Sequence, residues 1–220
     1  MTNRDRLEKA VDRLQHERAA FLSRFEGLSQ AQLDFSPSRN AWSVGQVAHH
    51  VALGESVWQG YLKNVIARGD RERGAVEHVS LKQIPFRSRF LPDFIFKSPL
   101  VVTPMSVFVN MLPRPFQSML FAVPLIKMDA SDRMQPGGRL PRAQILGLLE
   151  EVRKRTLDLV EPRADWNLSR FRVSHPLVGD QDIYGVLDLL ASHEQRHSLQ
   201  IDSIRKKSGF PGSADKAGAL

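Results

Sequence analysis

The amino-acid sequence predicts an all-α protein, a four-helix bundle that forms a single domain over residues 1–220. Four segments repeat apolar residues at spacings of three and four, which is the period of an amphipathic helix. The sequence shows no convincing strand alternation and no internal repeat. A hydrophobic content of 42% and a charged content of 25% lie near the globular average and exclude collagen-like, disordered and coiled-coil classes.

The first two helices are predicted over about residues 3–28 and 43–68. Arg18 occupies a core-facing position in the first helix, where it is either a paired structural arginine or a group that binds an anionic substrate or the acid group of a thiol cofactor. Ser43, followed three residues later by Gln46, predicts a capping box that opens the second helix.

The last two helices are predicted over about residues 141–160 and 181–206. Pro141 stands at the first helical position of the third helix, and Pro162 closes that helix. The fourth helix leads into a tail rich in Gly, Ser and Ala, which we expect to be flexible over residues 208–220.

An apolar insertion, about residues 71–138, separates the second and third helices and is too long for an ordinary connection. Seven of the twelve Phe fall between Phe86 and Phe121, and repeated prolines and charges interrupt the apolar runs, so the insertion is not a membrane span. We expect short helical or irregular pieces that pack over the bundle or into a dimer interface. A lid over a site and a peripheral membrane contact are the alternatives.

The net charge of +7 and a pI of about 10.0 raise nucleic acid or an anionic membrane as partners. Lys and Arg are scattered among Asp and Glu, however, which indicates a solvated basic surface and no nucleic-acid partner. The charged N-terminal segment lacks the apolar run of a secretory signal, so we expect a cytoplasmic protein. With no Cys, any metal must be held by His, Asp or Glu.

The fourth helix contains His193-Glu194-Gln195-Arg196-His197, the HExxH spacing that places two imidazoles one turn apart. At 100° per residue, His193 and His197 both face the core. A single inward imidazole is often satisfied by an ordinary hydrogen bond, but two in succession suggest a shared metal ion. A zincin protease is disfavoured because Ser203 stands where the metzincin pattern requires His.

Glu194 is the candidate catalytic residue, because a carboxylate beside a metal can position or deprotonate a bound water. A surface residue or a partner of a ligand is the alternative interpretation. The third ligand must come from another helix, where His50 lies about 60° and His49 about 160° from the centre of the apolar stripe. The predicted site is therefore His50, His193 and His197, with open positions for water or substrate. These ligands suit Zn, Ni or Fe(II) without choosing among them.

Two stretches resemble the DinB-like (YfiT-like) superfamily of metalloenzymes, which includes bacterial thiol S-transferases. Residues 42–52 (WSVGQVAHHVA) are similar to the family's helix start, whose closing His ligand falls on His50. Residues 175–179 (HPLVG) and 193–201 (HEQRHSLQI) are similar to its last-helix signature. The resemblance implies an up-down-down-up bundle, often a homodimer, with a three-histidine divalent metal site. In some members, it implies transfer of a low-molecular-weight thiol to an electrophile. Within this signature, we expect His175 to be a turn or capping residue.

These observations lead to an expected function: a metal-dependent transferase or hydrolase acting on a small-molecule substrate, with the insertion shaping the substrate cavity. Two other functions stay open. One is a non-catalytic metal-binding protein of a stress response, and the other is a basic module that binds a membrane or nucleic acid.

Overall fold

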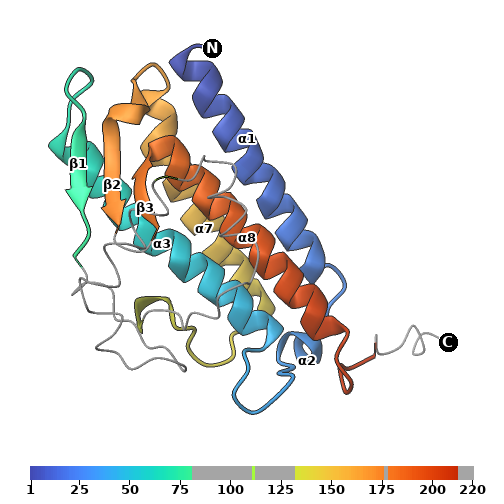
Figure 1. Ribbon diagram of the computed structural model, residues 1–220. Helices are drawn as coiled ribbons and strands as arrows, with labels where there is room; N and C mark the ends of the chain where they lie inside the picture. The colour runs from blue at the N-terminus through green and yellow to red at the C-terminus, as the bar shows by residue number, and fades with distance from the viewer. Residues whose placement is uncertain (81–110, 112–131, 176–177, 213–220) are drawn as a thin grey trace.

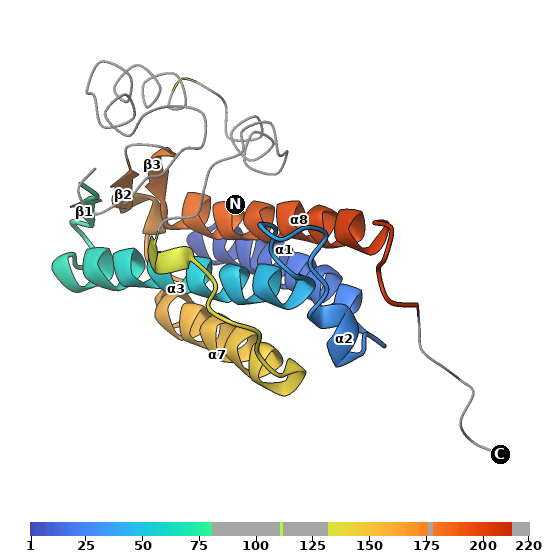
Figure 2. The same ribbon diagram turned by 90° about the horizontal axis from the view of Figure 1, so that it is seen from below.

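The computed structural model describes residues 1–80, 111, 132–175 and 178–212. In this part of the chain, four long helices lie side by side: α1 (Asn3–Leu22), α3 (Val44–Arg68), α7 (Arg142–Val160) and α8 (Ile183–Arg205). Helix α1 packs on α8, and α3 contacts both α7 and α8. The colours in Figures 1 and 2 show that α1 and α8 run in one direction and that α3 and α7 run in the other.

The predicted helix boundaries hold closely except in the first helix. Helix α1 ends at Leu22, and a 3₁₀ turn, η1 (Ser23–Phe25), leads to Gly27, whose φ of 71° is readily adopted only by glycine. A short helix, α2 (Gln30–Leu33), follows before α3.

The starts of α3 and α8 follow from local chemistry. The Ser43 hydroxyl accepts from the backbone N–H of Gln46, and the Gln46 side chain accepts from the backbone N–H of Ser43, which confirms the capping box. At the start of α8, Oδ1 of Asp182 accepts from the backbone N–H of Gly185 at 2.8 Å. These caps fix where the helices that carry the candidate ligands begin.

A small sheet corrects the expectation that the chain has no strands. Its strands are β1 (Ala75–His78), β2 (Phe171–His175) and β3 (Gly179–Asp182), in the order β1-β2-β3. Strand β1 pairs parallel with β2, and β2 pairs antiparallel with β3. The strands are only four or five residues long, too short for alternation to be evident, and the parallel pair joins segments far apart in sequence. Strand β3 runs directly into α8, so the sheet anchors the start of that helix.

Apart from Met111, the insertion is described only at its two ends. Strand β1 lies at its beginning, and a 3₁₀ turn, η3 (Asp132–Met134), lies near its end and packs against α3. The expectation of short packed pieces between Phe86 and Phe121 falls almost wholly outside the described residues.

Two apolar clusters fill the interior. One surrounds Leu14, Leu62 and Leu187, and the other surrounds Phe21, Val47 and Ile201. On each long helix, a buried charged residue falls between the part that enters one cluster and the part that enters the other; these residues are Arg18, Glu55, Arg153 and Glu194. The core is therefore divided by a polar layer. Among the described helices, none combines the length and apolar character needed to cross a bilayer.

Candidate metal centre

The structure brings the three predicted histidines together. His50 projects from α3, and His193 and His197 project from consecutive turns of α8. Nε2 of His193 lies 3.2 Å from Nε2 of His50 and 3.1 Å from Nε2 of His197. One ring nitrogen from each residue lies within 4.8 Å of the other two, so these three histidines could hold a metal ion.

Hydrogen bonds at the opposite ring nitrogens fix two of the imidazoles. Nδ1 of His50 donates to the carbonyl oxygen of Met134 at 2.7 Å. Nδ1 of His197 donates to Oε1 of Gln200 at 2.7 Å. In a neutral imidazole, a proton on Nδ1 leaves a lone pair on Nε2. Both Nε2 lone pairs therefore face His193.

This donor arrangement fits a divalent cation. Nε2 of His193 carries at most one proton, so neutral histidines can convert only one of the two short N···N contacts into a hydrogen bond. A cation between the rings would interact favourably with all three lone pairs. The outer hydrogen bonds to Met134 and Gln200 are the kind that orient metal-ligating histidines.

Electrostatics keep the imidazoles neutral, which is the form that binds metal. Burial lowers the pKa of His50 to about 4, although its bond to the Met134 carbonyl opposes the shift. Burial, together with the nearby His50, lowers the pKa of His197 to about 3. Burial and the two neighbouring imidazoles hold the pKa of His193 well below its usual value. At neutral pH, all three are therefore available as ligands.

His49 lies outside this cluster. It is only partly buried, whereas His50 is 5% exposed. A β-carbon built on Gly137 would lie 3.9 Å from Cε1 of the His49 ring. The helical projection distinguished the two adjacent histidines because a step of 100° turns them to different faces of α3.

Two other residues, Trp42 and Gly54, lie against the histidine rings. The Trp42 ring lies 4.7 Å from the His50 ring, and the His193 ring lies directly over Gly54. Met134 joins the site through its backbone carbonyl. The sequence did not reveal the roles of Met134 and Gly54. Met134 contributes only its backbone carbonyl and Gly54 only the absence of a side chain, and neither produces a recognisable sequence motif.

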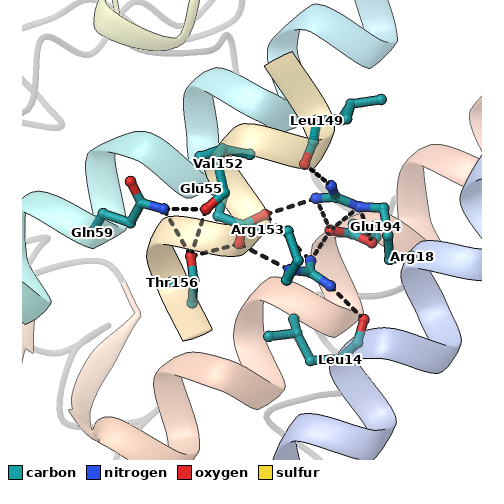
Figure 3. A network of polar contacts seen from close by, with 9 residues as sticks. All are labelled: Leu14, Arg18, Glu55, Gln59, Leu149, Val152, Arg153, Thr156 and Glu194. Carbon is teal, nitrogen blue, oxygen red and sulfur yellow. Dashed lines mark hydrogen bonds and ion pairs between the residues drawn. The ribbon is translucent and has the colours of Figure 1, made fainter. Parts of the chain in front are cut away.

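Glu194 lies in a buried salt-bridge cluster (Figure 3). Its Oε1 accepts from Nη2 of Arg18 at 2.7 Å and from Nη2 of Arg153 at 2.5 Å, and the residue is only 1% exposed. Arg18 donates to both oxygens of this carboxylate, and Arg153 donates to one of them. The catalytic role considered for Glu194 stays a prediction, and in the described structure its carboxylate is held by these two arginines.

Arg18 is a paired structural arginine. It forms ion pairs with Glu55 and Glu194, each at 2.7 Å, and is 5% exposed. Burial opposes the charged form of Arg18, but the two carboxylates outweigh it and raise the pKa. Burial likewise opposes ionisation of Glu55, and Arg153 and Arg18 overcome it, so the pKa of Glu55 is lowered. Arg18 and Glu55 are therefore both charged in the folded protein.

His175, at the end of β2, acts as a turn residue, as expected. Its Nδ1 accepts from the backbone N–H of Val178 at 3.4 Å. Its ring lies 5.4 Å from that of Trp58 on α3, and burial lowers its pKa to about 4.

The fold and the site define a helical protein in which helices α3 and α8 bring three neutral histidines together. A family model of the DinB superfamily matches residues 13–201, and the chain belongs to this superfamily. The matched region includes all three histidines and the four charged residues of the polar layer. No curated protein and no solved structure matches the chain significantly.

Proposed function

We propose that this protein is a divalent-metal-dependent enzyme that either transfers a low-molecular-weight thiol to an electrophile or hydrolyses a small molecule. The observation that carries the proposal is the convergence of three Nε2 atoms, two of them oriented by outer hydrogen bonds. Three protein ligands are typical of catalytic rather than structural metal sites, because they leave positions for a substrate.

A bound divalent ion acts as a Lewis acid and lowers the pKa of a thiol or a water molecule. The chain supplies the conditions for this chemistry. Burial keeps the imidazoles of His50 and His197 neutral, and the Met134 carbonyl and the Gln200 side chain hold their Nδ1 protons on the far side of the rings. The Trp42 ring shields one side of His50 from water.

The proposal includes the finer architecture implied by the resemblance: an up-down-down-up four-helix bundle that acts as a cytoplasmic homodimer, with the insertion over residues 71–138 shaping the substrate cavity. Zn, Ni and Fe(II) all accept imidazole ligands, so the metal is defined only as a divalent ion of this group. A catalytic role for Glu194 stays a prediction, and the proposal does not depend on it.

The test begins with elemental analysis of protein purified without a histidine tag. We expect close to one transition-metal ion per chain. The metal-loaded protein is then assayed with small thiols and electrophiles, and with a panel of hydrolysable esters and amides, against the metal-stripped protein as control. Metal-dependent turnover would support an enzyme. A stoichiometrically loaded protein that turns over none of these substrates would favour a non-catalytic metal-binding protein, and failure to bind any metal would overturn the proposal.

A further inference from the structure

The polar layer is built from one charged side chain of each long helix (Figure 3). Arg18 comes from α1, Glu55 from α3, Arg153 from α7 and Glu194 from α8, and none is more than 5% exposed. Each arginine contacts both carboxylates. Arg18 pairs with Glu55 and Glu194 at 2.7 Å, and Arg153 pairs with Glu55 at 3.0 Å and with Glu194 at 2.5 Å.

The two arginines are also fixed to the backbone of each other's helix. Nη1 of Arg153 donates to the carbonyl oxygen of Leu14 at 2.8 Å, and Nη1 of Arg18 donates to the carbonyl oxygen of Leu149. Leu14 lies one helical turn before Arg18, and Leu149 lies one turn before Arg153. This reciprocal arrangement fixes α1 and α7 at a defined axial position.

The two carboxylates, in contrast, lie on the helices that carry the histidines. Glu55 follows His50 by five residues on α3, about 7.5 Å along the axis, and Glu194 directly follows His193 on α8. Since the same two arginines hold both carboxylates, any sliding or rotation of α3 against α8 breaks a charged hydrogen bond in the buried layer.

Neutral side chains complete the cluster around Glu55. The Thr156 hydroxyl donates to Oε1 of Glu55 at 2.6 Å, and the Gln59 amide donates to the Thr156 hydroxyl at 2.8 Å. Both Glu55 oxygens are therefore occupied by donors from other residues. A fully satisfied network of this kind favours one arrangement of its members over alternatives.

We infer that Arg18, Glu55, Arg153 and Glu194 are positioning residues for the metal centre. By setting the register of α3 against α8, they hold His50 against His193 and His197 in a ligating geometry. Buried ion pairs contribute little net stability compared with apolar packing, and setting a specific arrangement is the role best suited to them. The part of the test that measures metal binding rests on the proposed function. The part that measures the positions of the histidine rings in metal-free protein does not.

The test compares wild-type protein with two variants of the layer and one control. Arg153→Lys keeps the charge but lacks the planar fork that reaches Glu55, Glu194 and the Leu14 carbonyl together. Thr156→Val is a milder change that removes one neutral donor to Glu55 and keeps the side-chain shape. The control is Val160→Ala, which removes buried apolar volume from the same helix, α7, outside the layer.

Two experiments are carried out on folded protein, well below its melting temperature. Titration with Co²⁺ gives the affinity and the visible absorption spectrum of the site. In metal-free protein, NMR gives the cross-relaxation between the ring protons of His50 and His193. We expect Arg153→Lys to bind Co²⁺ at least tenfold more weakly, with an altered spectrum and a weaker cross-peak. Thr156→Val should show a smaller change in the same direction, and Val160→Ala should match wild type.

Wild-type affinity, spectrum and cross-peaks in a folded layer variant would overturn the inference, as would an equal loss in Val160→Ala. If Arg153→Lys does not fold, Thr156→Val decides. If wild-type protein binds no Co²⁺, the proposed function fails, and the cross-peaks of the metal-free proteins still decide whether the layer positions the histidines.

Discussion

The imidazole of His193 lies on the backbone of Gly54, where α8 meets α3. A β-carbon built on Gly54 would lie 3.0 Å from Cε1 of His193, closer than carbon atoms normally approach, and 3.6 Å from Nδ1, which is an ordinary contact distance. Gly54 stands one turn after His50 on α3, on the side that faces the ligands of α8. The missing side chain therefore gives the His193 ring its place beside His50.

Gly54→Ala should weaken metal binding about tenfold or more, because the new methyl group pushes His193 away from the other two ligands. Alanine otherwise stabilises a helix interior by up to about 1 kcal/mol relative to glycine, so folding should be affected little. Metal affinity by competition with a chelator provides the measurement.

The matched control is Gly60→Ala on the same helix, since a β-carbon there meets nothing within 4 Å. This variant should be slightly more stable and bind metal as wild type does. Equal metal affinity in Gly54→Ala and Gly60→Ala would show that His193 can move without loss of the site.

The ligand assignment predicts that His50→Ala, His193→Ala and His197→Ala each lose most of the bound metal, because each removes one of three converging nitrogens. His49→Ala is the control, since its ring lies outside the cluster. Elemental analysis of the purified variants measures the outcome. Retention of metal by His50→Ala together with loss by His49→Ala would reverse the assignment.

Removing one member of the polar layer should destabilise the fold strongly. Arg18→Met leaves Glu55 and Glu194 each without one charged partner in the interior, and we expect a loss of about 3–5 kcal/mol in the free energy of unfolding. Urea denaturation measures the change. The control is Arg4→Met, which breaks an exposed pair with Asp165 and should cost less than about 1 kcal/mol. Similar losses in the two variants would show that removing Arg18 leaves no costly unpaired charge in the interior.

The metal-free protein should lose stability as pH falls below about 6.5. His50 and His175 have folded-state pKa values of about 4, and His197 has one of about 3, whereas an unfolded histidine titrates near 6.5. Between these values, the unfolded chain binds more protons than the folded chain, so stability falls with pH by up to about 1.4 kcal/mol per pH unit for each histidine. The loss should level off below the folded-state values.

Urea denaturation at pH 7, 6 and 5 tests this dependence, with His50→Gln as the comparison because it removes one of the titrating groups. The variant should show a shallower slope between pH 6.5 and 5. An identical slope in both proteins would mean that His50 does not contribute to the acid sensitivity of the fold.

Much of the helical structure could be predicted from the sequence, and so could the three histidines that form the candidate metal site. Helical phase depends on residues a few positions apart, so the periodicity that predicted α3 and α8 also predicted which way His50, His193 and His197 face. Capping chemistry is equally local, and the box at Ser43 appears as expected. The same helical projection predicted that Arg18 faces the core, but it did not predict which residues pair with Arg18.

The partners themselves depended on the tertiary structure. Whether Glu194 faces a metal or a guanidinium is set by the register of α8 against α1 and α7, and this register depends on contacts between residues 176 and 41 positions apart in the sequence. The parallel pairing of β1 with β2 and the Met134 carbonyl bonded to His50 are long-range in the same sense. The sequence determined by itself which side chains point inward, because this is a local property of helices. Only packing of the four helices decided which of those side chains meet, because distances between helices depend on the whole core.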